Sequence, residues 1–187
     1  MIVFLDFEAS SLGKHGFPIE VGWAAENGTE ESHLIRPASG WEEWSEEAEG
    51  IHGITRDRLL QEGTPHDAVA RRMLEMLTGH DLYASAPSWD GKWLSTLLRA
   101  AGLPRHALRL RDTDEAQRDA VLAVLERGGV PVGARRDILD GILEPARLAA
   151  KADAPAHRAL EDARGELNLW RNAVRQAEDV AWRWSKR

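Results

Sequence analysis

Residues Ile2–Glu8, IVFLDFE, form an apolar run that ends in two acidic residues. Alternate residues of a β-strand project from the same face, so a strand over this stretch would present Asp6 and Glu8 side by side. Two neighbouring carboxylates repel each other unless a cation lies between them, and hard divalent cations prefer carboxylate oxygens. The stretch therefore predicts a strand that ends in half of a metal site.

The composition favours one domain without thiol chemistry. The chain has 187 residues, of which 43% are hydrophobic, and this is enough for one well-buried core. We expect a single domain over residues 1–187. The sequence has no cysteine, which leaves oxygen and imidazole as the strong metal ligands. A net charge of −7 argues against a protein that coats long nucleic acid, but it is compatible with a nuclease whose metal ions meet the phosphate.

The sequence gives no sign of a membrane protein. No stretch approaches the roughly 18 uninterrupted apolar residues that a membrane span needs, and residues 1–8 lack the pattern of a secretion signal. The absence of cysteine fits a reducing compartment. We therefore expect a cytoplasmic protein that does not engage a membrane.

Turn residues divide the first part of the chain into three strand-like runs, which are Ile2–Glu8, Ile19–Ala25 and Ser32–Arg36. The segment Glu26–Gly28 (ENG) between the second and third runs is a hairpin signal. These runs predict an antiparallel meander.

Helices and strands alternate further along the chain. Apolar residues recur at helical spacing in Asp67–Leu77, with Pro65 expected at the first helical position. The elements expected after it are a strand at Leu82–Ala84, a helix at about Ser88–Ala101, a strand at Leu108–Arg111, a helix at Asp114–Arg127, and a helical remainder with a long stretch from about Pro155 to Trp184. This order predicts an α/β fold with a mixed five-stranded sheet and a C-terminal tail that is helical from about residue 171.

A phosphodiesterase with two metal ions needs about four carboxylates and often a base. Asp90 is a candidate because it follows the expected strand Leu82–Ala84 at the beginning of a helix, where α/β sheets present functional side chains. Asp162 is another, with His157 five residues before it. On one continuous helix these two side chains would not share a face, so Pro155 is expected to place His157 at the beginning of the helix.

The same His-to-Asp spacing also occurs at His52 and Asp57. His52 lies in Ile51–Thr55 (IHGIT), where the glycine predicts a turn, whereas His157 opens a strongly helical segment. Asp112 is better explained as the cap of the following helix than as a further metal ligand.

The ordered motifs resemble the DEDDh exonucleases. This DnaQ-like family includes the proofreading subunit of the bacterial replicative polymerase, ribonuclease T and oligoribonuclease. The motifs are DFE at residues 6–8, IHGIT at 51–55, Asp90, and HRALEDA at 157–163, and they span residues 1 to about 170. The resemblance implies an RNase H-like fold with helices on both faces of the sheet and with Asp6 on a central strand.

The resemblance also implies an activity. Asp6, Glu8, Asp90 and Asp162 would bind two Mg²⁺ or Mn²⁺ ions, and His157 would be the general base. The protein would be a 3′-to-5′ exonuclease that releases nucleoside 5′-monophosphates from single-stranded DNA or RNA ends or from short oligonucleotides. Substrate contacts would come from Phe7, Ala9, Ser10, His52 and Trp89. A homodimer or a polymerase partner would be consistent with the family.

Two positions depart from the family's pattern. Ser85 and Ala86 stand where family members often carry His-Asn, and Ala9-Ser10-Ser11 stands where they often carry Thr. Two alternatives stay open beside the exonuclease. One is a polymerase-accessory or nucleic-acid-binding module with this fold and little activity, and the other is a phosphodiesterase that acts on small nucleotides.

Overall fold

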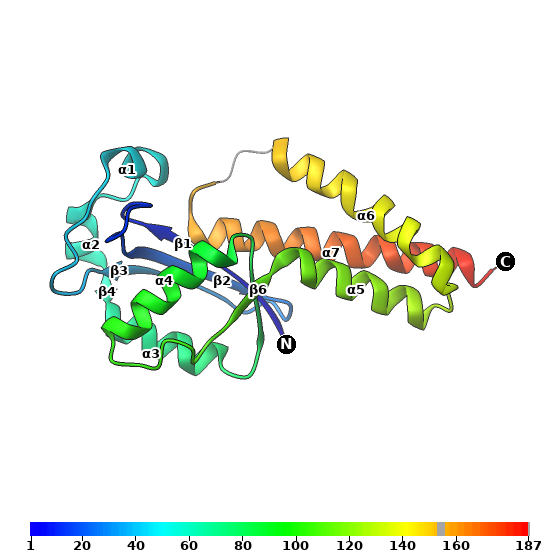
Figure 1. Cartoon of the computed structure of the whole chain (residues 1–187), viewed down its shortest axis with the longest axis horizontal. Coiled ribbons are helices and arrows are strands. Elements are labelled where there is room, and N and C mark those ends of the chain that lie inside the picture. The colour runs from blue at the N-terminus through cyan, green and yellow to red at the C-terminus, as the bar shows by residue number, and fades with distance from the viewer. Residues whose placement is uncertain (153–155, 187) are drawn as a thin grey trace.

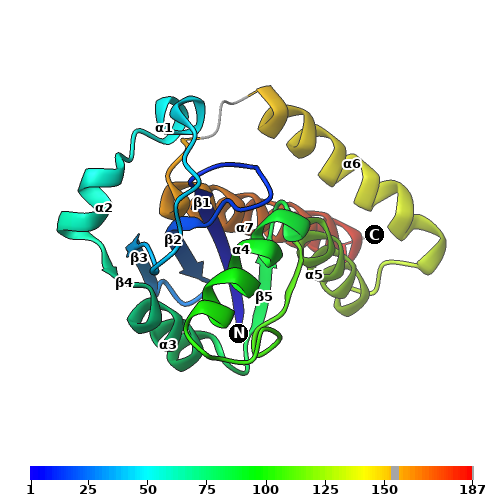
Figure 2. The ribbon, with the colours of Figure 1, turned by 60° about the vertical axis from the view of Figure 1, so that its left-hand side comes forward.

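The computed structural model of the chain describes residues 1–152 and 156–186 and is built around one mixed sheet (Figure 1). The strand order is β4-β3-β2-β1-β5-β6, and Figure 2 shows the neighbouring strands side by side. The strands are β1 (Ile2–Ala9), β2 (Pro18–Ala25), β3 (Glu30–Arg36), β4 (Thr64–Pro65), β5 (Asp81–Ala84) and β6 (Leu110–Asp112). Strand β1 lies inside the sheet, as predicted for the strand that carries Asp6.

The predicted mixed sheet is confirmed, but the predicted number of strands is wrong. β1, β2 and β3 are antiparallel, and β5 and β6 continue the sheet in parallel with β1. The sixth strand is β4, whose two residues pair with Ile35 and Arg36 of β3. A strand of two residues has no periodicity that a sequence pattern can reveal.

The helices are α1 (Glu46–His52), α2 (Arg56–Glu62), α3 (His66–Leu77), α4 (Pro87–Ala100), α5 (Thr113–Arg127), α6 (Val132–Ala152) and α7 (Ala159–Trp184). Helix α5 is capped by Asp112 as predicted, since the Asp112 carboxylate accepts a hydrogen bond of 2.8 Å from the Asp114 backbone N–H. Pro65 is the residue before α3 rather than its first helical residue. His52 was expected in a turn, yet it is the last residue of α1, a seven-residue helix that Ser45 caps.

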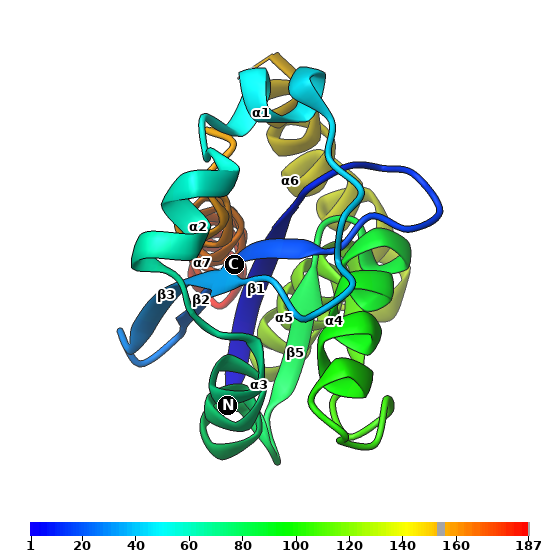
Figure 3. The ribbon, with the colours of Figure 1, turned by 90° about the vertical axis from the view of Figure 1, so that its left-hand side faces the viewer.

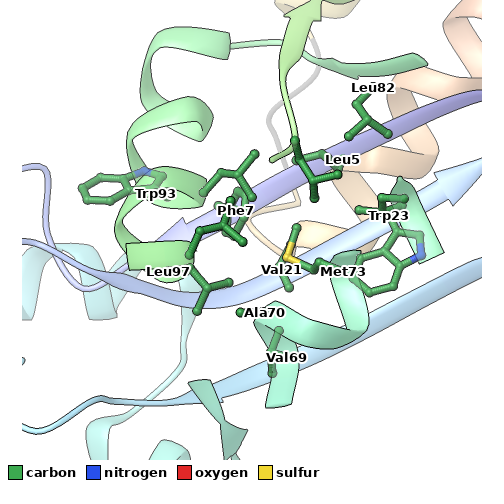
Figure 4. Close-up of a cluster of buried hydrophobic side chains, with 14 of the residues drawn as sticks. Leu5, Phe7, Val21, Trp23, Val69, Ala70, Met73, Leu82, Trp93 and Leu97 are labelled. Atoms are coloured by element: carbon green, nitrogen blue, oxygen red, sulfur yellow. The ribbon is translucent and has the colours of Figure 1, made fainter. Parts of the chain in front are cut away.

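Helices cover both faces of the sheet. Side chains of β1 point alternately to the two faces, so successive residues of β1 meet different helices. Val3, Leu5 and Phe7 join the buried cluster under α3 and α4, which Figure 4 shows. Phe4 points to the opposite face and packs with residues of α5 and α7, such as Leu167. Seen from the side, α4 and α7 lie on opposite sides of the sheet (Figure 3). Asp6 and Glu8 have the parity of Phe4, so they face α7.

Helices α5, α6 and α7 pack together and extend beyond the sheet (Figure 1). The helical tail expected from about residue 171 is the second half of α7. The long helix was predicted to begin at about Pro155, but α7 begins at Ala159. Pro155 itself lies outside the described residues. None of the helices in residues 1–152 and 156–186 is long and apolar enough to cross a membrane.

Candidate metal centre

Three carboxylates from the two ends of the chain meet on the α7 face of the sheet. Asp6 and Glu8 project from β1, and the first turn of α7 brings Asp162 to them. One carboxylate oxygen from each of the three residues lies within 4.8 Å of the others. The structure therefore joins the two halves of the site that the sequence separates by more than 150 residues.

Asp90 reaches the same strand from the other side. β5 ends at Ala84 and pairs with β1 only as far as Phe4, so no strand among residues 1–152 and 156–186 pairs with the later residues of β1 on this side. Helix α4 places the Asp90 side chain beside this part of β1. The Asp90 Oδ1 accepts a hydrogen bond of 3.2 Å from the Phe7 backbone N–H. The Asp90 side chain is only 3% exposed, and within the described part of the chain its Oδ2 has no hydrogen-bond partner.

Burial and mutual repulsion raise the pKa of three of these carboxyl groups, those of Asp6, Glu8 and Asp90. Burial is the main cause that raises the pKa of Asp90 to about 7 and that of Glu8 to about 7. The pKa of Asp6 lies well above its usual value, first through burial and then through the charges of Asp90, Glu8 and Asp162. Carboxylates crowded in this way can all ionise when a cation neutralises them. An oxygen-only donor set with one buried, unpaired oxygen fits a hard divalent cation such as Mg²⁺ or Mn²⁺.

Glu166 is a further carboxylate near the cluster that sequence reasoning missed. It lies one turn beyond Asp162 on α7, and its charge raises the pKa of both Asp6 and Asp90. Its own pKa is raised to about 6, mainly by burial. The signal was the four-residue spacing from Asp162, which places two helical side chains on one face. With Ser85, Glu166 lines a pocket of about 650 Å³ at the N-terminus of α5.

Two residues of β2 fix how α7 docks, and both were missed. Gly22 pairs with Asp6 in the ladder, and a β-carbon on Gly22 would clash with the backbone of Ala159 and Leu160. Glu20 is 1% exposed, and its carboxylate binds the Arg158 guanidinium at 2.7 and 3.1 Å. A lone acid inside an apolar strand was the signal in the sequence, since a buried carboxylate needs a partner.

His157 lies just outside the helix, as expected. The N-cap of α7 is Arg158, so His157 does not share the helical geometry of Asp162. Its backbone is left-handed, with φ 53°. Asp162 lies in the first turn of α7, because the helix starts at Ala159 and thus later than the sequence suggested. Its Oδ1 accepts a hydrogen bond of 3.0 Å from the Ala156 backbone N–H.

The predicted substrate residues at the end of β1 are largely engaged in packing and hydrogen bonds within the fold. The ring of Phe7 is in the core under α3 and α4. Ala9 follows an irregularity in the β1–β2 pairing and lies opposite Pro18. Ser10 is fully buried, and its hydroxyl accepts a hydrogen bond of 3.1 Å from the Phe17 backbone N–H.

His52 and Trp89, the other two predicted substrate residues, differ in exposure. The Nδ1 of buried His52 accepts a hydrogen bond of 3.0 Å from the Ile54 N–H, while its Nε2 has no partner among the described residues. Burial is also the main cause that lowers the pKa of His52. Trp89 is 41% exposed, and its indole stacks on Trp93 with ring centres 5.9 Å apart. The Lys92 ammonium lies 5.1 Å from the Trp89 ring centre.

Comparisons with known proteins support the fold. No protein-family model matches the sequence, and no curated protein matches it significantly. Solved structures of exonuclease I match the chain with TM-scores of 0.66 for the Methylocaldum szegediense protein at 16% identity and 0.65 for the E. coli protein with a dT13 oligonucleotide at 15% identity. Each match covers 98% of this chain and 42% of the exonuclease I chain. This likeness shows the RNase H-like fold expected from the sequence, in a chain that spans about two fifths of exonuclease I.

Proposed function

We propose that this chain is a divalent-metal-dependent 3′-to-5′ exonuclease that releases nucleoside 5′-monophosphates from single-stranded DNA or RNA ends or from short oligonucleotides. The observation that carries the proposal is the meeting of Asp6, Glu8 and Asp162, with Asp90 bonded to the Phe7 N–H and close enough for its charge to raise the pKa of Asp6. Exonuclease I, whose fold the chain shares, has been solved with a dT13 strand. The domain organisation that goes with the proposal is a single exonuclease domain over residues 1–187.

Asp6, Glu8, Asp90 and Asp162 are the residues that would hold two Mg²⁺ or Mn²⁺ ions. Such ions, when bound, lower the pKa of a coordinated water and neutralise charge on a phosphate that is being attacked. The protein contributes a rigid arrangement of oxygens, because β1 is an interior strand and Asp90 is locked onto its backbone.

His157 is the proposed general base. A neutral imidazole nitrogen can take a proton from the attacking water. The water oxygen bonds to the phosphorus of the last phosphodiester. The bond from this phosphorus to the 3′ oxygen of the preceding nucleotide breaks, and that oxygen leaves on the shortened strand. His157 is partly exposed, in keeping with a group that has to give its proton back to solvent.

Substrate contacts are proposed around this centre. Trp89 follows from its exposed indole next to Asp90, since bases stack on aromatic rings whatever their sequence. His52 is proposed through its loop, because its Nε2 is buried even though it has no partner among the described residues. Phe7 and Ser10 have both their side chains and their backbone N–H groups engaged within the fold, so the contact proposed for Phe7, Ala9 and Ser10 falls on the backbone of Ala9. Pairing with a second copy or with a polymerase stays a prediction.

One observation favours a second candidate, a binding module with little activity of its own. Ser85 lines the pocket beside Glu166 at a place where the family often carries a His-Asn pair, so an amide that could orient substrate is missing. Retention of the carboxylate cluster opposes this candidate, since a binding module has no need to crowd acids around buried oxygen atoms.

Matched DNA and RNA oligonucleotides with free and with blocked 3′ ends test the proposal. We expect stepwise release of mononucleotides in Mg²⁺ or Mn²⁺ from free 3′ ends, and none in excess chelator. Metal binding without strand degradation would favour the binding module. Cleavage of a mononucleotide ester in preference to a five-nucleotide strand would indicate a small-nucleotide phosphodiesterase instead.

A further inference from the structure

Glu20 is a buried charge whose whole hydrogen-bonding capacity is directed at the beginning of α7. It lies in the apolar strand β2 opposite Glu8, and it is 1% exposed. Removing a carboxylate from water costs several kcal/mol unless it is paired and hydrogen-bonded. Here the Arg158 guanidinium donates bonds of 2.7 and 3.1 Å, and the Ala159 backbone N–H adds one of 3.1 Å.

These bonds fix the backbone directly after His157. Arg158 and Ala159 are the next two residues of the chain, and both are tied to the one carboxylate of Glu20. On the other side of His157, the Ala156 N–H is bonded to the Asp162 carboxylate. His157 is therefore anchored on both sides, once to the sheet and once to α7.

The anchors matter because His157 has a left-handed backbone, with φ 53°. This conformation is strained for a residue with a β-carbon, and it persists where neighbouring contacts hold it. We propose that Glu20, through Arg158 and the Ala159 N–H, is a positioning residue that holds His157 at the end of β1 that carries Glu8. The effect of Glu20 on catalysis rests on the proposed function, whereas its effect on the position of His157 does not.

The chain offers a matched control for this link. Glu30 of β3 also joins the sheet to α7 through a bidentate arginine, Arg164, with the Arg164 Nε at 2.9 Å from the Glu30 carboxylate. That pair is exposed and lies a turn and a half beyond Arg158. Glu30→Gln therefore removes a comparable link without touching the residues beside His157.

Kinetics of four variants separate a positioning role from a general loss of stability. Glu20→Gln should lower kcat by about 10- to 100-fold with KM within about threefold, because a displaced base costs rate rather than binding. Glu30→Gln should change kcat by less than about twofold. In a His157→Ala background, Glu20→Gln should cause no further loss, since the group that it positions is gone. An equal loss in both backgrounds would overturn the inference.

A measurement independent of activity completes the test. In histidine-labelled protein, the imidazole NMR signal that disappears in His157→Ala belongs to His157. This signal should shift or broaden in Glu20→Gln and stay in place in Glu30→Gln. If Glu20→Gln does not fold, Arg158→Lys replaces it, because lysine keeps the charge but loses the bidentate geometry. An unmoved signal in a folded variant contradicts the inference. A shifted signal in a protein that degrades no strand leaves the inference standing and rejects the exonuclease.

Discussion

Asp6 and Gly22 face each other across the antiparallel ladder of β1 and β2, on the side of the sheet that α7 covers. Because Gly22 has no side chain, the backbone of Ala159 and Leu160 comes against β2 at this level. The same close approach sets the distance of Asp162 from β1. One missing side chain on β2 thus determines how close the C-terminal carboxylate comes to the N-terminal pair.

The first prediction concerns this contact. Gly22→Ala should push α7 away from the sheet, lower the free energy of unfolding by about 1–3 kcal/mol, and weaken divalent metal binding. Chemical denaturation and calorimetric titration with Mn²⁺ measure the two effects. The matched control is Gly165→Ala on α7, where a β-carbon meets open space and should stabilise the helix by about 0.5–1 kcal/mol. Tight metal binding by folded Gly22→Ala would show that the approach of α7 does not control the site.

The second prediction separates Asp162 from its helical neighbour. Asp162→Asn should reduce release of mononucleotides from a 3′-labelled single strand by about 100-fold or more, because a neutral amide is a poor ligand for a hard cation. Glu161→Gln removes an acid from the same turn that points to solvent, and it should keep activity within about twofold. Persistent activity in well-folded Asp162→Asn would reject the assignment of Asp162.

The third prediction follows from the pKa of Asp90, which burial raises from 3.8 to about 7. Between these two values the folded protein holds a proton that the unfolded chain has lost, so stability without metal should fall as the pH rises from about 4 to 7. Asp90→Asn cannot ionise, and its amide oxygen can still accept the Phe7 N–H. Thermal unfolding in chelator at pH 8 should show the variant more stable than the wild type by on the order of 5 °C, with little difference near pH 4. A variant that is less stable at pH 8 would contradict the burial of an ionised group.

The fourth prediction concerns metal binding itself. Since Glu8 and Asp90 both have a pKa of about 7, binding of a divalent ion should release protons near neutrality and strengthen as the pH rises from 6 to 8. Calorimetry in two buffers with different ionisation enthalpies counts the protons. Mn²⁺ should also raise the melting temperature more at pH 8 than at pH 6. Equal affinity at both pH values would place the ion away from these carboxylates.

The fifth prediction addresses the exposed indole beside Asp90. Trp89→Ala should raise KM for an oligonucleotide by about tenfold with a smaller change in kcat, as expected for the loss of one stacked base. Trp182→Ala is the control, because Trp182 is also exposed and has Lys186 over its ring, yet it lies near the far end of α7. Equal effects of the two substitutions would argue against a base on Trp89.

The elements that sequence predicted best are those whose own pattern defines them. β1, β2 and β3 lie between clear turn signals, α4 has helical periodicity and a proline in its first turn, and α5 is capped by Asp112. The helices α1 and α2 were missed because each is seven residues long and is recognisable chiefly by its cap, Ser45 or Thr55. Short elements depend on the surfaces that they meet, and those surfaces come from other parts of the chain.

The residues of the candidate site also differ in how well the sequence could predict their positions. Asp6 and Glu8 could be placed together from strand parity alone, and Asp90 from its place after β5. Glu20 could not be linked to the site in advance, because its role depends on an arginine 138 residues later in the chain. Contacts of that range require the three-dimensional arrangement and not a local pattern.

The late position of α7 has a consequence for synthesis of the protein. β1 is made early, but its two acids remain an incomplete site until Asp162 has been translated and α7 has docked against Gly22. A nascent chain that ends after α5 can form most of the sheet yet cannot assemble the three-carboxylate cluster. Docking of α7 is therefore the folding step at which a divalent cation can first meet all three carboxylates together.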